Sequence, residues 1–93
     1  MRTIEWTTQF KCDYKRESKG QHRATLDDEL FPILDSLAND QSLALCHRDH
    51  PLTGDWKDHR DCHIRPDLVL IYQKPDADTL RLVRLGSHGE LGL

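Results

Sequence analysis

The sequence predicts an α+β fold in which two N-terminal helices pack on one face of a mainly antiparallel four-stranded sheet, in the order β-α-α-β-β-β. Two patterns support this prediction. Apolar residues recur at the three- and four-residue spacing of helices in the first half of the chain, and from residue 56 they follow the two-residue alternation of strands. With 93 residues the chain is long enough for one core, so we expect a single domain over residues 1–93.

The first predicted elements are a short strand and a helix. The segment RTIEW, residues 2–6, is rich in residues that favour extended backbone. Thr7 or Thr8 can cap a helix that ends at Gly20, because threonine side chains accept hydrogen bonds at helix N-termini and glycine often follows the last turn. The basic side chains of this helix form a predicted basic surface: Lys11, Lys15, Arg16 and Lys19.

A second helix is predicted between residues 26 and 37, where leucines and an isoleucine recur at helical spacing. Thr25 followed by Asp28 resembles a capping box, with aspartate in the position usually held by glutamate. Pro32 lies inside the pattern and has no N–H to donate to the carbonyl of Asp28. We therefore expect the helix to be kinked or divided in two there.

The second half of the chain is predicted to form strands. Residues 41–55 are expected to be an irregular connection. Three strands should follow it: WKDHRDCHI over residues 56–64, DLVLIYQK over 67–74 and TLRLVRLG over 79–86. Alternation places Trp56, Cys62 and Ile64 on one face of the first of these strands. The second strand is apolar on both faces, which is typical of a central strand.

Charge and cysteine content limit the classes of function. The formal net charge of −3 argues against a protein that binds polyanions by overall charge. The charge is uneven, since residues 1–24 hold six basic against three acidic residues, and residues 25–45 hold five acidic residues and no lysine or arginine. The chain can therefore present one positive face.

The three cysteines are an odd number without C-x2-C spacing, so we expect no disulfide framework. The first residues, MRTIEW, form no apolar leader, and no segment approaches membrane-spanning length. These observations favour a cytoplasmic protein with reduced thiols and no membrane partner.

The most unusual segment is HRDHPLTGDWKDHRDCHIRPD, residues 47–67, which contains four of the six histidines. Metal binding is one interpretation, because imidazoles and thiolates are common ligands. The spacing argues against it, since Cys46-His47 and Cys62-His63 are adjacent pairs, and neighbours on a strand point to opposite faces. No familiar zinc spacing is matched, and we predict neither a metal site nor a cofactor.

Two other interpretations compete for this segment. One is a solvated polar loop, and we expect His22, His47 and His59 to be surface residues of that kind. The other is acid–base cleavage of RNA, which needs a base for the 2′-OH, an acid for the leaving 5′-oxygen and positive charge at the phosphate. Histidine, with an ordinary pKa of about 6.5, suits both proton transfers, and arginine suits the phosphate.

Strand parity places the residues for such chemistry together. Asp61 and His63 share one strand face, Asp67 begins the next strand, and Arg84 and His88 share parity on the last strand. We therefore predict that three histidines, two aspartates and one arginine converge at one end of the sheet: His50, His63, His88, Asp61, Asp67 and Arg84.

The same residues carry a family resemblance. The segment DHPLTGDWKDHRDCHIRPDLVLIYQ, followed by LRLVRLGSHGEL, resembles the YafQ branch of the RelE/ParE toxin superfamily. That branch has the pattern D-H-x-L-x-G-x-W-x-x-x-R-D-x-H-x-x-x-D-x-x-L-I-Y, followed by R-x-G-x-H near the C-terminus. The match is close over residues 49–90, and residues 1–45 agree in layout and length.

The resemblance implies a toxin of a type II toxin–antitoxin system. Such a toxin is a ribosome-dependent, metal-independent mRNA endonuclease (an mRNA interferase), and a cognate antitoxin that is itself a DNA-binding repressor holds it inactive. The implied catalytic residues are His50, His63, Asp67 and His88, with Asp61 and Arg84 in support. The implied partners are the antitoxin, ribosomal RNA and mRNA, and the toxin alone is expected to be monomeric. The basic surface suits either ribosomal RNA or an acidic segment of the antitoxin.

One departure from the family pattern follows the last histidine. Relatives usually carry an aromatic residue there, whereas this chain has Leu91 and Leu93. Stacking of a base on an aromatic ring contributes roughly 1–3 kcal/mol, so we expect weaker cleavage or a changed codon preference. Two alternative functions stay open: a non-nucleolytic toxin like the ParE branch, which would not need convergent histidines, and a weakened homologue that mainly binds its antitoxin.

Overall fold

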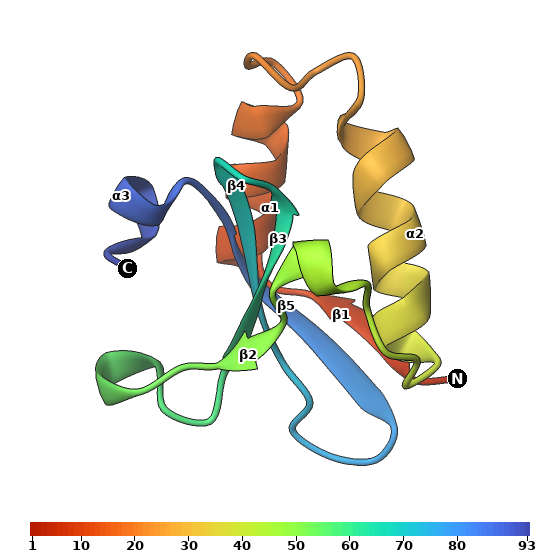
Figure 1. Cartoon of the computed structure of the whole chain (residues 1–93). Helices are drawn as coiled ribbons and strands as arrows, with labels where there is room; N and C mark the ends of the chain where they lie inside the picture. The colour runs from red at the N-terminus through yellow and green to blue at the C-terminus, as the bar shows by residue number, and fades with distance from the viewer.

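The computed structural model describes all residues, 1–93, and contains five strands, three α-helices and two short 3-10 helices (Figure 1). In chain order these elements are β1 (Thr3–Trp6), α1 (Thr8–Glu17), α2 (Leu26–Ala38), η1 (Leu45–His47), β2 (His50–Pro51), η2 (Gly54–Trp56), β3 (Arg60–Arg65), β4 (Leu68–Gln73), β5 (Thr79–Gly86) and α3 (His88–Leu91). The predicted α+β class is confirmed. The predicted number of strands is wrong, because the sheet has five rather than four, and α3 is an additional helix.

The sheet has the strand order β1-β5-β4-β3-β2. Strand β1 runs parallel to β5, and the other three pairings are antiparallel. The unpredicted strand is β2, in which His50 pairs with Asp61 and Pro51 with Arg60. Two residues are too few for an alternation to be visible in a sequence, so only the pairing with β3 defines this strand.

Helices α1 and α2 pack on the same face of the sheet, as predicted from their apolar stripes. Phe10 of α1 and Leu30 of α2 belong to one buried cluster with Leu70 of β4. The other face of β4 carries Val69, which α3 covers through Leu91, and Figure 1 shows α3 on the opposite side of the sheet from α2. Strand β4 is therefore buried on both faces, which accounts for its continuous apolar sequence.

The helix starts agree with the sequence prediction at one place and differ at another. Thr7 caps α1, and its side chain accepts a hydrogen bond from the backbone N–H three residues later. The capping box predicted for Thr25 and Asp28 is wrong, because the Thr25 backbone (φ −123°, ψ −3°) lies outside the extended region and its side chain makes no cap bond. The capping box of this chain joins Ser87 and Glu90 and begins α3.

Helix α2 continues past Pro32 and is not divided. The missing N–H removes one hydrogen bond, but Leu30, Ile33 and Leu34 are buried around the proline and hold the helix on the sheet. Pro32 itself is exposed, so its ring does not disturb the core. At 13 residues α2 is the longest helix, and none has the length and apolar character needed to cross a membrane.

Strand β3 begins at Arg60, later than the predicted start at residue 56. Cys62 and Ile64 lie in the core on the helix side, as the alternation predicts. Trp56 lies in η2 and packs on the cluster of the other face, so its predicted place beside Cys62 is wrong. Asp58 separates the two segments with a left-handed backbone (φ 70°), which interrupts the alternation.

An irregularity in β5 changes which side chains face the helices. Leu82 pairs with Tyr72, but the adjacent Ile71 pairs with Arg84, so one extra residue is inserted in β5. Leu85 therefore enters the core on the helix side, where continued alternation would place Arg84. The parity predicted for the end of this strand is wrong for that reason.

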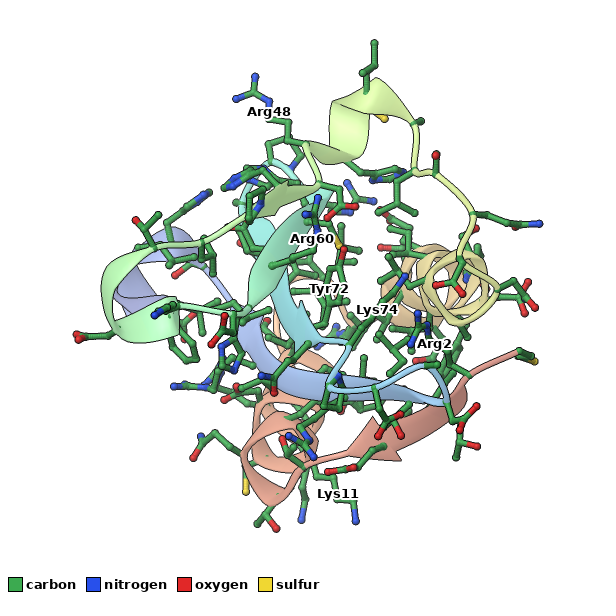
Figure 2. All side chains as sticks on the ribbon, turned by 90° about the horizontal axis from the view of Figure 1, so that it is seen from below. Arg2, Lys11, Arg48, Arg60, Tyr72 and Lys74 are labelled. Atoms are coloured by element: carbon green, nitrogen blue, oxygen red, sulfur yellow. The ribbon has the colours of Figure 1, made fainter.

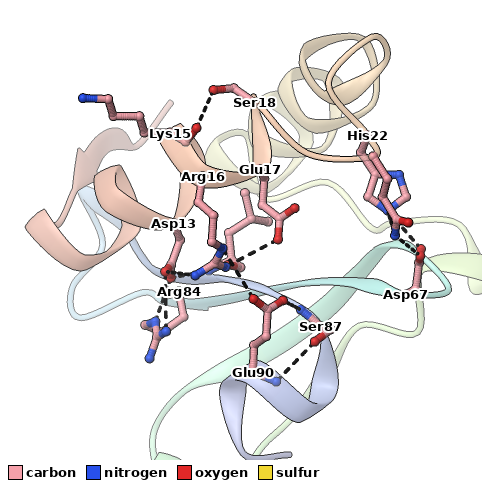
Figure 3. A network of polar contacts seen from close by, with 12 residues as sticks. Asp13, Lys15, Arg16, Glu17, Ser18, His22, Asp67, Arg84, Ser87 and Glu90 are labelled. Carbon is pink, nitrogen blue, oxygen red and sulfur yellow. Dashed lines mark hydrogen bonds and ion pairs between the residues drawn. The ribbon is translucent and has the colours of Figure 1, made fainter.

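A buried carboxylate joins α1 to the edge of β5 (Figure 3). Asp13, 1% exposed, accepts hydrogen bonds from Arg84 Nε (2.7 Å) and from the backbone N–H of Leu85 (3.0 Å). Arg16 Nη2 donates to the carbonyl of Leu85 (2.9 Å), so two side chains satisfy the backbone of this strand edge. Gly86 permits this approach, because a Cβ there would lie 2.9 Å from Arg16 Nη2.

Candidate active site

The pairing of β2 with β3 brings His50 against a buried carboxylate. His50 Nε2 lies 2.8 Å from Asp61 Oδ1. The Asp61 side chain is 3% exposed, whereas that of His50 is 51% exposed. One edge of the imidazole therefore meets solvent and the other meets the carboxylate.

The contacts of His50 show which ring nitrogen faces Asp61. His50 Nδ1 lies 3.1 Å from the carbonyl oxygen of Pro51, and because a carbonyl only accepts, Nδ1 carries the hydrogen. In a neutral ring Nε2 would then be an acceptor that faces a second acceptor, Asp61 Oδ1. The contact is attractive only when His50 is an imidazolium or Asp61 is protonated, so the pair holds one proton.

Asp61 has an environment typical of a functional carboxylate. Its Oδ1 is buried and has no hydrogen-bond partner, since the contact with His50 has the distance of an ion pair without the alignment of a hydrogen bond. Burial raises the pKa of Asp61 above its ordinary value, and the charges of His50, His63 and His88 oppose this rise. A buried carboxylate with a free lone pair beside three histidines is suited to orient an imidazole.

His63 and His88 form a second pair of side chains in the candidate site, in addition to His50 and Asp61. Their ring centroids are 4.9 Å apart and the rings are inclined by 65°. They meet because His63 of β3 pairs with Val69, Val69 pairs with Gly86 of β5, and α3 begins directly beyond that strand end. Burial lowers the pKa of His63 and the charge of His88 lowers it further, while Asp61 opposes this fall, and a lowered pKa favours the neutral imidazole that can accept a proton.

Two surface hollows meet at His88. The first, of about 390 Å³, is lined in part by His50 and Asp61. The second, of about 440 Å³, is lined in part by His63 and Arg48. His88 borders both hollows, so it lies between the pair formed by His50 and Asp61 and the side chain of His63. No group of three or more His, Cys, Asp or Glu side chains in the chain is arranged to hold a metal ion.

The two leucines of the C-terminal tail have different surroundings. Leu91 is buried and packs with Val69 against the sheet. Leu93 is 40% exposed and lines the hollow that also contains His50 and His88. Leu93 is therefore the apolar residue of the tail that borders the site, and it offers contact without an aromatic face for stacking.

The loop that precedes β2 is held by the sheet (Figure 2). His47 Nδ1 donates to the backbone carbonyl of His63 (2.7 Å). Tyr72 donates its hydroxyl hydrogen to Asp49 Oδ1 (2.5 Å), and Arg60 Nε lies 3.2 Å from the same oxygen. His47 is half-buried, so the prediction that it is a solvated surface residue is wrong.

Asp67 contacts Gln21 and His22 rather than the three histidines of the candidate site. It lies in the turn between β3 and β4, and its side chain is 56% exposed. Its carboxylate accepts a hydrogen bond from Gln21 Nε2 (2.8 Å) and lies 3.2 Å from His22 Nε2 (Figure 3). Of the predicted residues, the structure therefore groups four: His50, Asp61, His63 and His88.

Two arginines with predicted roles, Arg84 in support of catalysis and Arg16 in the basic surface, are engaged in ion pairs. Arg84 pairs with Asp13, and Arg16 lies within ion-pair distance of Asp13 (3.2 Å) and Glu90 (3.4 Å) (Figure 3). The remaining members of the basic surface are exposed and make no ion pair: Lys11, Lys15 and Lys19. These lysines are free to meet an anionic partner.

Sequence analysis missed Arg48, the arginine that borders the second hollow. It is exposed and makes no ion pair. The signal for it was weak, because the family pattern begins at residue 49 and a single arginine in a loop has no periodicity. Only the tertiary structure shows that the loop holding Arg48 lies beside His63 and His88.

The chain matches known proteins over nearly its whole length. The family model that it matches, over residues 2–92, is described as a bacterial toxin of type II toxin–antitoxin system, YafQ. The chain is 37% identical over 90 residues to the mRNA interferase toxin YafQ of Escherichia coli, and the match covers 97% of this chain and 95% of that relative.

Solved structures agree with these matches. A copper-bound mutant toxin from Helicobacter pylori superposes with a TM-score of 0.86 at 34% identity, covering 98% of this chain and 99% of the other. The toxin in the crystal structure of the Escherichia coli DinJ–YafQ toxin–antitoxin complex superposes with a TM-score of 0.80 at 36% identity, covering 97% and 96% of the two chains.

Proposed function

The chain belongs to the YafQ family of bacterial toxins of type II toxin–antitoxin systems, and we propose that it is a ribosome-dependent mRNA endonuclease that cleaves mRNA in the ribosomal A site and so inhibits translation. The Escherichia coli relative is named an mRNA interferase toxin. The observation that most supports this function is the group of three histidines around one buried aspartate, bordered by two open hollows.

The proposed reaction assigns the two proton transfers to His63 and His88. His63 takes the proton from the 2′-OH, whose oxygen attacks the neighbouring phosphorus. The bond between phosphorus and the 5′-oxygen then breaks, and His88 gives a proton to that oxygen, leaving a 2′,3′-cyclic phosphate and a 5′-hydroxyl. The lowered pKa of His63 supports the role of base, because the neutral imidazole is then present at working pH. Histidine can perform both steps without a metal ion.

The proposed role of the pair formed by His50 and Asp61 is electrostatic. When the proton that the pair holds lies on His50, the exposed imidazolium presents positive charge to the hollow while the pair as a whole is neutral, and Asp61 keeps this imidazole in position. Asp67 stays in the proposed catalytic set as a second orienting carboxylate. It must first leave Gln21 and His22 to reach an imidazole, which an exposed side chain in a turn can do.

The proposed partners are a cognate antitoxin protein, which is also a DNA-binding repressor, and the translating ribosome of the prokaryotic cytoplasm. The antitoxin is proposed because an Escherichia coli relative has been solved in a toxin–antitoxin complex. The exposed lysines at positions 11, 15 and 19 suit ribosomal RNA, since phosphate contacts by such side chains release counterions.

In vitro translation of a defined mRNA, with cleavage sites mapped by primer extension, tests this function. The parent chain is expected to produce cuts only when ribosomes are present. A variant in which His50, His63 and His88 are all alanine is expected to produce none, because both proton transfers and the charged pair are lost. If the parent produces no ribosome-dependent cut, the proposal is wrong and a non-nucleolytic toxin is favoured.

The same assay compares the two aspartates. Asp61→Asn is expected to lower the cleavage rate on the order of 10²-fold, because an amide cannot hold the shared proton; the equivalent change in a Ser-His-Asp triad costs roughly 10⁴-fold. Asp67→Asn is expected to cost about 10-fold or less, since its carboxylate contacts Gln21 and His22. A larger loss for Asp67→Asn than for Asp61→Asn would reverse the assignment of the orienting carboxylate.

A further inference from the structure

The reaction proposed above needs a cation at the scissile phosphate, and most arginines near the site already have partners. Arg84 is bound to buried Asp13, and Arg60 lies 3.2 Å from Asp49. Arg48 differs from both, because it is exposed, makes no ion pair and lines the same hollow as His63 and His88. Figure 2 shows its side chain projecting outward from the loop before β2.

We propose that Arg48 binds the phosphate that is cleaved, in the place assigned to Arg84 by strand parity. The guanidinium presents a planar fork of donors that matches two phosphate oxygens, and it stays charged throughout the reaction. This inference rests on the proposed nuclease function and extends it by naming the residue that meets the negative charge.

The backbone around Arg48 is fixed on both sides. His47 donates to the carbonyl of His63, and Asp49 accepts from Tyr72. Between these anchors Arg48 adopts a left-handed conformation (φ 47°, ψ 46°), which is uncommon for a residue other than glycine. Such strain persists only where the surrounding structure imposes it, and it is concentrated at functional sites.

The charge of Arg48 acts on the proposed base. After burial and the charge of His88, the positive charge of Arg48 also lowers the pKa of His63. Arg48 is thus close enough to influence the imidazole that takes the 2′-OH proton. A phosphate bound by Arg48 would lie beside both His63 and His88, which border the same hollow.

Two measurements on Arg48→Gln and Arg48→Lys test the proposal. The first is ribosome-dependent cleavage, in which Arg48→Gln is expected to lose roughly 10²- to 10³-fold, as when one donor to transition-state charge is removed. Arg48→Lys is expected to keep part of the activity, because lysine retains the charge without the fork. Arg81→Gln is the control; Arg81 pairs with Glu5 and is expected to be dispensable.

The second measurement is the titration of each protein with adenosine 3′-monophosphate, followed by the NMR signals of the His63 and His88 rings. The parent and Arg81→Gln are expected to bind it alike, and Arg48→Gln at least 10-fold more weakly, with unchanged thermal unfolding. Binding by Arg48→Gln that equals the parent's, or no binding by the parent, overturns the assignment of Arg48. Cleavage by Arg48→Gln at the parent rate overturns it too. If the parent does not cleave mRNA, the nuclease proposal fails, and the titration still decides whether Arg48 binds phosphate.

Discussion

The His88→Ala variant is expected to lose mRNA cleavage by about 10²- to 10⁴-fold while its fold is retained, which is the loss expected when one general acid is removed. His88 borders both hollows and lies 4.9 Å from His63 between ring centroids. It is exposed at the first residue of α3, so its removal opens no cavity in the core. Cleavage rates at saturating ribosome concentration measure the effect.

His59→Ala is the matched control for this variant. The ring of His59 packs against Trp56 (5.4 Å between centroids) and belongs to neither hollow, so its loss is expected to leave the cleavage rate within about 3-fold of the parent, well below the effect of losing an acid. Removing His88 should also raise the pKa of His63, because a neighbouring positive charge is lost. Cleavage by His88→Ala at the parent rate would show that another group supplies the proton.

The Asp13→Ala variant is expected to lose about 3–5 kcal/mol of unfolding free energy, the usual cost of removing one partner from a buried ion pair. Asp13 is 1% exposed and joins Arg84, Arg16 and the backbone of Leu85. Its loss leaves a half-buried guanidinium and a backbone N–H without partners at the place where α1 meets β5. Urea denaturation followed by circular dichroism measures the change.

Asp28→Ala is the matched control for stability. Asp28 is exposed in the first turn of α2, and its loss is expected to cost less than about 1 kcal/mol, the contribution of a charge at a helix terminus. Equal destabilisation by the two substitutions would mean that the buried pair does not hold α1 on the sheet.

The contribution of Asp13 should also depend on pH. Burial acts to raise its pKa, but the hydrogen bonds from Arg84 and Leu85 outweigh burial, and the pKa lies below its ordinary 3.8. Because the pKa is depressed in the folded state, the stabilisation is complete above the unfolded value of about 3.9 and is lost as the pH falls through the folded value. The stability difference between parent and Asp13→Ala should therefore be constant from pH 7 to about 5 and shrink below pH 4.

Local patterns in the sequence determined much of the fold. The helical spacing in residues 26–37, the cap at Thr7 and the alternation of Cys62 with Ile64 each depend on neighbours within a few positions, and each corresponds to the structure. The family segment over residues 49–90 also identified the three histidines, because residues at fixed spacings can be recognised in a sequence without knowing how the strands pair.

Tertiary structure decided what depends on partners distant in the chain. Parity along β5 holds only while the strand is regular, and the inserted residue after Leu82 takes Arg84 out of the alternation of Leu80 and Leu82. The Arg84 guanidinium pairs with Asp13, 71 positions away in the chain. Asp61, rather than Asp67, faces His50 because the two-residue strand β2 pairs with β3 at that point. A strand of two residues is too short to produce a periodic pattern in the sequence. Arg48 borders the same hollow as His63 and His88 and makes no ion pair, whereas Arg60 and Arg84 pair with Asp49 and Asp13. The sequence shows which charged residues the chain contains, whereas the fold determines which of them form ion pairs and which remain unpaired.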